Sequence, residues 1–166
     1  MLKKSVEDLL NRQIEREGYS SILYLSMASW AETRGYAGVA EWLYAQAEEE
    51  KMHMLKIIRY INKKSGKAII PSFDRPPAEF EGLKIMFDQV LEHEQYITGS
   101  INEIVAETEK EKDYSTNNWL QWFVSEQVEE ESSVQAIIDK LDLVGDHNLY
   151  MFDRDIMSMR TEKGGE

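Results

Sequence analysis

Apolar and polar residues alternate with helical periodicity over almost the whole chain, and proline and glycine fall almost entirely between the periodic stretches. The pattern predicts an all-α protein with four long helices and a short fifth one. The long helices are expected at about 6–34, 38–64, 82–110 and 115–145, with Ser115 or Thr116 as the N-cap of the fourth. The fifth is expected at about 148–160, from apolar residues spaced three and four apart: Leu149, Phe152, Ile156 and Met159.

The links between these segments predict how the helices are arranged. Short links at 35–37 and 111–115 favour two antiparallel pairs, whereas residues 67–80 contain three prolines and form a long irregular connection. A helix of about 28 residues is ~42 Å long, and about fourteen extended residues reach ~46–50 Å. The connection can therefore run the length of a bundle and place the second and third helices parallel. We expect one domain, 1–166, with a four-helix bundle over about 6–145 and one long crossover.

Four glutamates lie on the apolar stripes of the four long helices: Glu17, Glu50, Glu94 and Glu130. A buried carboxylate without a compensating charge costs several kcal/mol, so glutamate normally faces solvent. Glu94 nevertheless shares its face with five apolar residues at helical spacing: Phe87, Val90, Leu91, Ile97 and Ile101. Glu17 has a more mixed face that includes Gln13 and two serines. Carboxylates that converge on one interior need cations, and the pattern predicts a metal site.

The pair Glu50 and His53, three residues apart, can reach one metal ion from a single helix. Gln127 lies one turn before Glu130. Four carboxylates and two divalent ions give a nearly neutral site, and oxygen and imidazole ligands without thiolate suit iron, manganese or zinc. The alternative is that these glutamates simply lie on solvated faces.

A second acidic stripe lies beside the first and comprises Glu49, Glu126 and Glu129. It is either a third cation site or a solvated acidic face. Two aromatic residues, Tyr24 and Trp122, lie two turns from acidic residues of these stripes. They either pack in the bundle or pass electrons to the metal. His93 and His147 have no matching constellation, and we expect them at the surface.

Composition narrows the possible functions. The chain has no cysteine and a formal net charge of −12, which excludes thiolate sites and disfavours nucleic acid and anionic membranes as partners. The segment MLKKSVEDLL lacks the apolar region of a signal peptide. No apolar run approaches the ~20 residues of a membrane span. We therefore expect a cytoplasmic protein.

At these residues the chain resembles the bacterial non-haem ferritins. The resemblance lies in EREGYSSILY, AEEEKMHM, EHEQYIT and NNWLQWFVSEQVEEE followed by IIDKL, and it covers nearly the whole chain. It implies a ferritin-like bundle that oxidises Fe(II) with oxygen or hydrogen peroxide. It also implies a hollow homo-oligomeric shell of twenty-four subunits that stores ferric mineral and thereby detoxifies iron.

The resemblance also implies roles for individual residues. Glu17, Glu50 and His53 would hold one iron, and Glu94 and Glu130 the other, with Glu50 bridging. Gln127 would lie beside the second iron. A third iron site would comprise Glu49, Glu126, Glu129 and Glu130, and the aromatics Tyr24 and Trp122 would lie near the centre.

The chain also departs from related proteins. Asn117 and Leu120 occupy positions where animal ferritins have the carboxylates of their three-fold channels, so an acidic channel is not expected. Met52 lies between Glu50 and His53, whereas the haem methionine of bacterioferritin directly follows the glutamate, so no haem is expected. Two alternatives to storage remain: a di-iron oxidase or peroxidase that retains its metals as a fixed cofactor, and a helical scaffold without metal. Gln127 speaks against the first, since such enzymes usually have a histidine on the fourth helix.

Overall fold

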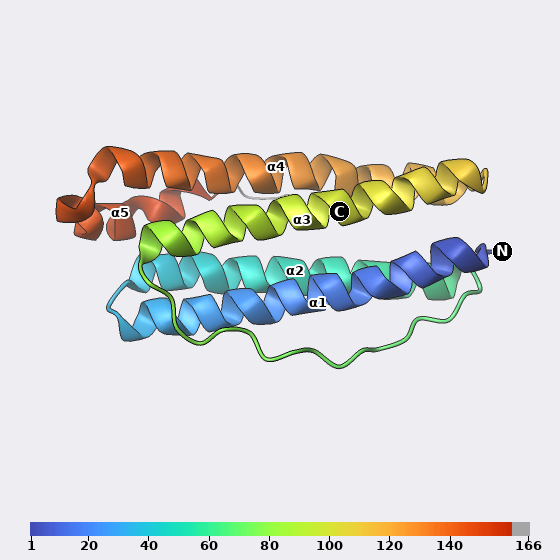
Figure 1. The fold of residues 1–166 in the computed structure, drawn as a ribbon, viewed down its shortest axis with the longest axis horizontal. Coiled ribbons are helices and arrows are strands. Elements are labelled where there is room, and N and C mark those ends of the chain that lie inside the picture. Colours follow the sequence, from blue (N-terminus) through green and yellow to red (C-terminus); the bar gives the residue numbers. More distant parts are fainter. Residues whose placement is uncertain (161–166) are drawn as a thin grey trace.

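The computed structural model of the chain describes residues 1–160 and has four long helices in a bundle (Figure 1). These are α1 (Lys4–Thr33), α2 (Ala37–Lys63), α3 (Leu83–Lys110) and α4 (Tyr114–Val144). The predicted all-α architecture is confirmed, and the helix boundaries agree with the expected ones to within about two residues. The expectation of one domain extends to residue 166, and residues 161–166 lie outside the described part.

The crossover between α2 and α3 runs along the whole bundle beside α1, so that α2 and α3 point in the same direction (Figure 1). Side chains of α1 fix it at both ends. Asn11 donates to Lys67 O at 3.1 Å and accepts from Ile69 N at 2.8 Å, and Ser26 donates to Pro77 O. In between, the Phe73 ring lies so close to Gly18 that a Cβ there would come within 2.4 Å of it. The predicted long crossover is confirmed, and its packing requires a glycine on α1.

The N-terminus of α4 differs from the sequence expectation. Asp113 is the N-cap, because its side chain accepts from Thr116 N at 3.2 Å and from the Thr116 hydroxyl at 2.6 Å. The predicted caps Ser115 and Thr116 were therefore wrong. Aspartate is as good an N-cap as serine or threonine, and the cap lies two or three residues earlier than expected.

The predicted short fifth helix is confirmed, and it is less regular than expected. It consists of the 3₁₀ turn η1 (Asp146–Asn148), the helix α5 (Leu149–Asp155) and the 3₁₀ turn η2 (Ile156–Met159). Phe152 and Ile156 are buried against the bundle, so this part of the apolar face packs within its own chain. Asp153 accepts a hydrogen bond from Val39 N at 2.9 Å, which ties α5 to the first turn of α2.

The core consists of two apolar clusters separated by a polar layer. One cluster contains buried side chains from residues 23–31 of α1, 39–47 of α2, 83–90 of α3 and 134–141 of α4. The other contains buried side chains from residues 2–14, 57–61, 97–104 and 120–123. The four glutamates and His53 fall between the two clusters on every helix. The polar layer is thus closed at both ends by apolar packing. Within residues 1–160, no helix is both long enough and apolar enough to cross a membrane.

Candidate metal centre

The four predicted glutamates are all buried at the middle of the bundle. Glu17 and Glu94 are fully buried, and Glu50 and Glu130 are 1–2% exposed. Each comes from a different helix. Each is buried because it lies on the apolar stripe that its helix presents to the other three. The alternative of solvated faces is therefore wrong for these four residues.

Two buried groups of side chains have a geometry suitable for a metal ion. The first group is Glu17, Glu50 and His53, and the second is Glu50, Glu94 and Glu130. In each group one ligand atom per residue lies within 4.8 Å of the others. Glu50 belongs to both groups, so its carboxylate lies between two neighbouring cation positions.

The hydrogen bonds of these carboxylates are incomplete without a cation. Glu17 Oε2 and Glu50 Oε1 are buried and accept no hydrogen bond from any residue in the described range 1–160. An orphaned carboxylate oxygen in a buried layer is costly. A metal ion in each group would coordinate these oxygens, and the oxygen and imidazole donors suit iron.

The protonation of the centre reflects crowded negative charge. Burial, and next the charge of Glu94, raise the pKa of Glu50 well above its usual range. Burial, together with the charge of Glu130, raises the pKa of Glu94 to about 7. Burial lowers the pKa of His53, but Glu50 and Glu17 outweigh it and hold that pKa well above the ordinary value. Protons therefore occupy the centre when metal is absent, and metal binding must displace them.

Polar residues that lie beyond the predicted ligands orient the carboxylates. Gln13 donates to Glu17 Oε1 at 2.9 Å, and Gln46 donates to Glu130 Oε2 at 2.6 Å. The predicted Gln127 donates to Glu94 Oε2 at 3.1 Å and to Thr98 at 3.2 Å. Sequence reasoning missed the roles of Gln13 and Gln46. The available signal was their position, one turn before Glu17 and Glu50 on the same stripes.

The two predicted aromatic residues contact opposite sides of the centre. The Tyr24 hydroxyl is buried and donates to Glu94, and burial raises the pKa of Tyr24 well above its usual value. The Trp122 ring packs edge-on against the His53 ring, with centroids 5.4 Å apart, and Lys56 Nζ lies 3.4 Å from the centroid of Trp122. Both are in contact with a candidate ligand, and such contact is compatible with simple packing as well as with a redox role.

The three residues of the second acidic stripe have different surroundings in the structure. Glu126 joins His53 and Glu130 in a third group whose ligand atoms lie within 4.8 Å of one another. Glu49 is half-buried and pairs with Arg160 at 2.8 Å. Glu129 is exposed and belongs to none of the three groups found among residues 1–160.

The other two histidines differ from each other. His147 is exposed, as expected. His93 is not a surface residue, and that expectation was wrong: it is partly buried, and its Nε2 lies 2.7 Å from the Ser20 hydroxyl. Tyr19 and Tyr24 pack around its ring, and burial lowers its pKa. A polar neighbour on α1 could not be inferred from the surroundings of His93 on its own helix.

Comparisons with known proteins agree with the helical fold. Residues 7–144 match the ferritin-like domain family. The chain is 43% identical to a bacterial non-heme ferritin of Campylobacter jejuni, over 96% of each chain. It is 42% identical to a probable bacterial non-heme ferritin-like protein of Haemophilus influenzae, over 98% of this chain and 99% of the relative. The solved structure of an open pore ferritin from the archaeon Archaeoglobus fulgidus superposes with a TM-score of 0.92 at 38% identity, over 96% of this chain and 98% of that one.

Proposed function

The chain belongs to the ferritin family, and on that premise we propose that it stores iron after oxidising Fe(II) at the buried centre of each subunit. The observation that carries the proposal is the position of Glu50, which is shared by two buried groups of metal-compatible side chains. A shared carboxylate brings two Fe(II) ions side by side. Reduction of oxygen to hydrogen peroxide takes two electrons, and two Fe(II) ions supply them.

Each residue of the centre has a distinct part in this proposal. Glu17 and His53 bind the first Fe(II), Glu94 and Glu130 bind the second, and Glu50 bridges both. The opposed hydrogen bonds from Tyr24 and Gln127 hold the two oxygens of Glu94 in one orientation, which lowers the reorganisation needed when Fe(II) arrives.

The neutral amide of Gln127 supports release of the product. An anionic or imidazole ligand at this position would strengthen binding of the second ferric ion, whereas an amide that already donates to Glu94 and Thr98 adds no negative charge. The ferric ion is then free to move to a mineral. This feature favours storage over an oxidase that retains two irons as a fixed cofactor.

Storage of a mineral requires an enclosed space, and we propose a cytoplasmic homo-oligomeric shell of twenty-four subunits. Large apolar side chains that remain exposed on the subunit support association: Leu143, Tyr150, Ile70 and Tyr114 are each about 70–80% exposed. Burial of such side chains between subunits would remove apolar surface from water, which favours association.

Aerobic loading with Fe(II) tests the proposal. Wild-type protein should oxidise Fe(II) rapidly and retain far more than two irons per subunit in a large assembly, measured by size-exclusion chromatography with iron analysis. Glu50→Ala should slow the initial oxidation by at least about tenfold. Glu48→Ala, at an exposed position of the same helix, should leave it unchanged. An unaffected Glu50→Ala variant contradicts the centre, and a small oligomer with only two irons per subunit favours the fixed-cofactor oxidase.

A further inference from the structure

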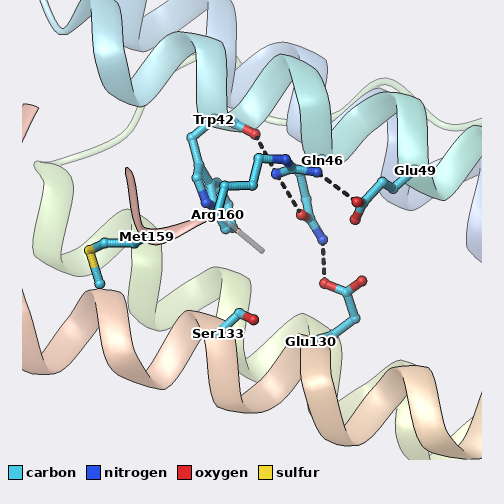
Figure 2. Close-up of a pocket in the computed structure, with 7 residues that line it drawn as sticks. All are labelled: Trp42, Gln46, Glu49, Glu130, Ser133, Met159 and Arg160. Carbon is cyan, nitrogen blue, oxygen red and sulfur yellow. Dashed lines mark hydrogen bonds and ion pairs between the residues drawn. The ribbon is translucent and has the colours of Figure 1, made fainter. Parts of the chain in front are cut away.

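The Arg160 side chain returns from the end of η2 to the edge of the polar layer. Its guanidinium pairs with Glu49 at 2.8 Å and donates to Trp42 O and to Gln46 Oε1, both at 3.4 Å (Figure 2). It also lies 5.8 Å from the centre of the Trp42 ring. The side chain is only 18% exposed, so Arg160 is a docked cation and not a solvated surface charge.

A single amide connects Arg160 to the candidate metal centre. Gln46 accepts from Arg160 with its oxygen and donates to Glu130 Oε2 with its nitrogen at 2.6 Å (Figure 2). Glu130 in turn belongs to two of the metal-compatible groups. The hydrogen bond from Arg160 favours the amide orientation in which the Gln46 nitrogen faces Glu130, so one side chain links the two charges.

A small cavity lies between these charges. It has a volume of about 20 Å³, and its polar lining consists of Gln46, Glu49, Glu130, Ser133 and Arg160. This volume is enough for one water molecule or one bare ion. An ion in the cavity would lie between the carboxylates of Glu49 and Glu130 and directly beside the guanidinium.

We propose that Arg160 is a tethered counter-ion of Glu49 that competes with a metal cation held by Glu49 and Glu130, so that filling of this outer site displaces Arg160 and undocks η2. Two positive charges a few ångströms apart repel strongly in a partly buried site, and the Glu49 carboxylate cannot serve both. The inference rests on the proposed function, because it concerns the third iron site beside the two-iron centre. It adds a positioning residue and a conformational response to that site.

The competition has a thermodynamic consequence in both directions. If a metal ion must release Arg160 in order to bind, its affinity is reduced by the free energy with which Arg160 is docked. Removal of Arg160 must then strengthen binding of that ion by this docking free energy. The two bridged positions of the centre should change little, because Glu17, Glu50 and His53 have no hydrogen bond or ion pair with Arg160 within residues 1–160, and Glu130 is linked to Arg160 through the Gln46 amide. This separates the effect from general damage to the bundle.

Titration of the assembled, iron-free protein with Zn²⁺ by isothermal calorimetry tests the proposal. Wild-type protein should bind two ions per subunit tightly and a third more weakly. In Arg160→Gln the third ion should bind about fivefold more tightly, with the first two unchanged. Arg160→Lys keeps the charge and should stay within about twofold of wild-type. Arg154→Gln, at an exposed position of α5, serves as the matched control.

Hydrogen exchange supplies an independent readout. In wild-type protein the backbone of Ile156–Met159 should exchange faster after the third Zn²⁺ has bound than after the second, and in Arg160→Gln it should be fast throughout. Unchanged or weaker third-site binding in Arg160→Gln, or exchange that ignores the third ion, overturns the proposal while leaving the two-iron centre intact. Failure of wild-type protein to bind the first two ions would contradict the proposed function, and this inference with it.

Discussion

The hydroxyl of Tyr24 on α1 donates a hydrogen bond to the carboxylate of Glu94 on α3. The other oxygen of that carboxylate accepts from Gln127 on α4 at 3.1 Å. Three helices therefore converge on one candidate metal ligand, and all three side chains are buried. Glu94 is held in place before a metal ion binds, which is the usual requirement for a fast reaction at a preformed site.

Tyr24→Phe should shift the pH dependence of Fe(II) oxidation to higher pH. Its hydrogen bond lowers the pKa of Glu94, although burial and the charge of Glu130 outweigh it. Without the hydroxyl, that pKa rises further and a larger fraction of Glu94 is protonated near neutral pH. We expect a rate loss of about five- to tenfold at pH 6.5, as for a lost hydrogen bond to a buried charge, and a smaller loss at pH 8. The measurement is the initial rate by stopped-flow absorbance. Tyr96→Phe, at an exposed position, should behave as wild-type, and an equal loss at both pH values would contradict this account.

Metal-free protein should become less stable as the pH rises from about 4.5 to above 7. The pKa of Glu94 is about 7 in the folded state and about 4.5 as an isolated group, so the unfolded chain loses its proton first. Glu94 then destabilises the fold by an amount on the order of 3 kcal/mol once both states are ionised. His53 acts in the same direction, because its pKa is raised in the folded state. It therefore stabilises the fold below about pH 6.5, and this stabilisation is lost as the pH rises through the pKa of His53 in the folded state. Thermal unfolding at pH 5 and pH 8 measures the change. Glu94→Gln should reduce it, and a higher melting temperature at pH 8 than at pH 5 would be the opposite result.

Glu126→Ala should change the number of Fe(II) ions oxidised per oxygen molecule, whereas Glu129→Ala should change it little. Both residues belong to the predicted third site, but only Glu126 lies within ligand distance of His53 and Glu130. Glu129 is exposed on α4. Oxygen consumption recorded together with Fe(II) oxidation gives the ratio for each variant. If the two variants have equal effects, the shell brings Glu129 into the site through a contact outside the single subunit. If neither has an effect, the stripe is a solvated acidic face.

Gly38→Ala should undock α5 and destabilise the protein by about 1–3 kcal/mol. An added Cβ would lie 1.8 Å from the backbone oxygen of Asp153, so α5 could no longer approach the first turn of α2. Phe152 and Ile156 would then lose part of their burial. Gly99→Ala is the control, because a Cβ there meets nothing within 4 Å and should stabilise α3 by about 0.5–1 kcal/mol. Chemical denaturation of both variants measures the difference, and an unchanged Gly38→Ala variant would mean that α5 contributes little to stability.

The sequence alone determined the architecture and which candidate ligands lie in the interior. Helical periodicity, the glycine at position 35 and the prolines at 71, 76 and 77 are local signals, so they predict the helices and the crossover without knowledge of the packing. The same holds for Glu50 and His53, because residues three apart on a helix share a face whatever lies opposite. Glutamates on apolar stripes could be recognised as unusual because the residues that share a face follow from their spacing along one helix.

Only the tertiary structure decided which side chains meet across helices. The sharing of Glu50 by two groups, the donation from Gln46 to Glu130, the pairing of Arg160 with Glu49 and the burial of His93 against Ser20 all join residues far apart in the chain. Such contacts depend on the relative height and rotation of neighbouring helices. When a helix rotates about its axis, its side chains meet different neighbours, but the spacing of its apolar residues in the sequence stays the same. The pattern therefore does not show which residue lies opposite on the next helix. The division of the second acidic stripe, with Glu126 at the centre and Glu129 at the surface, has the same physical cause.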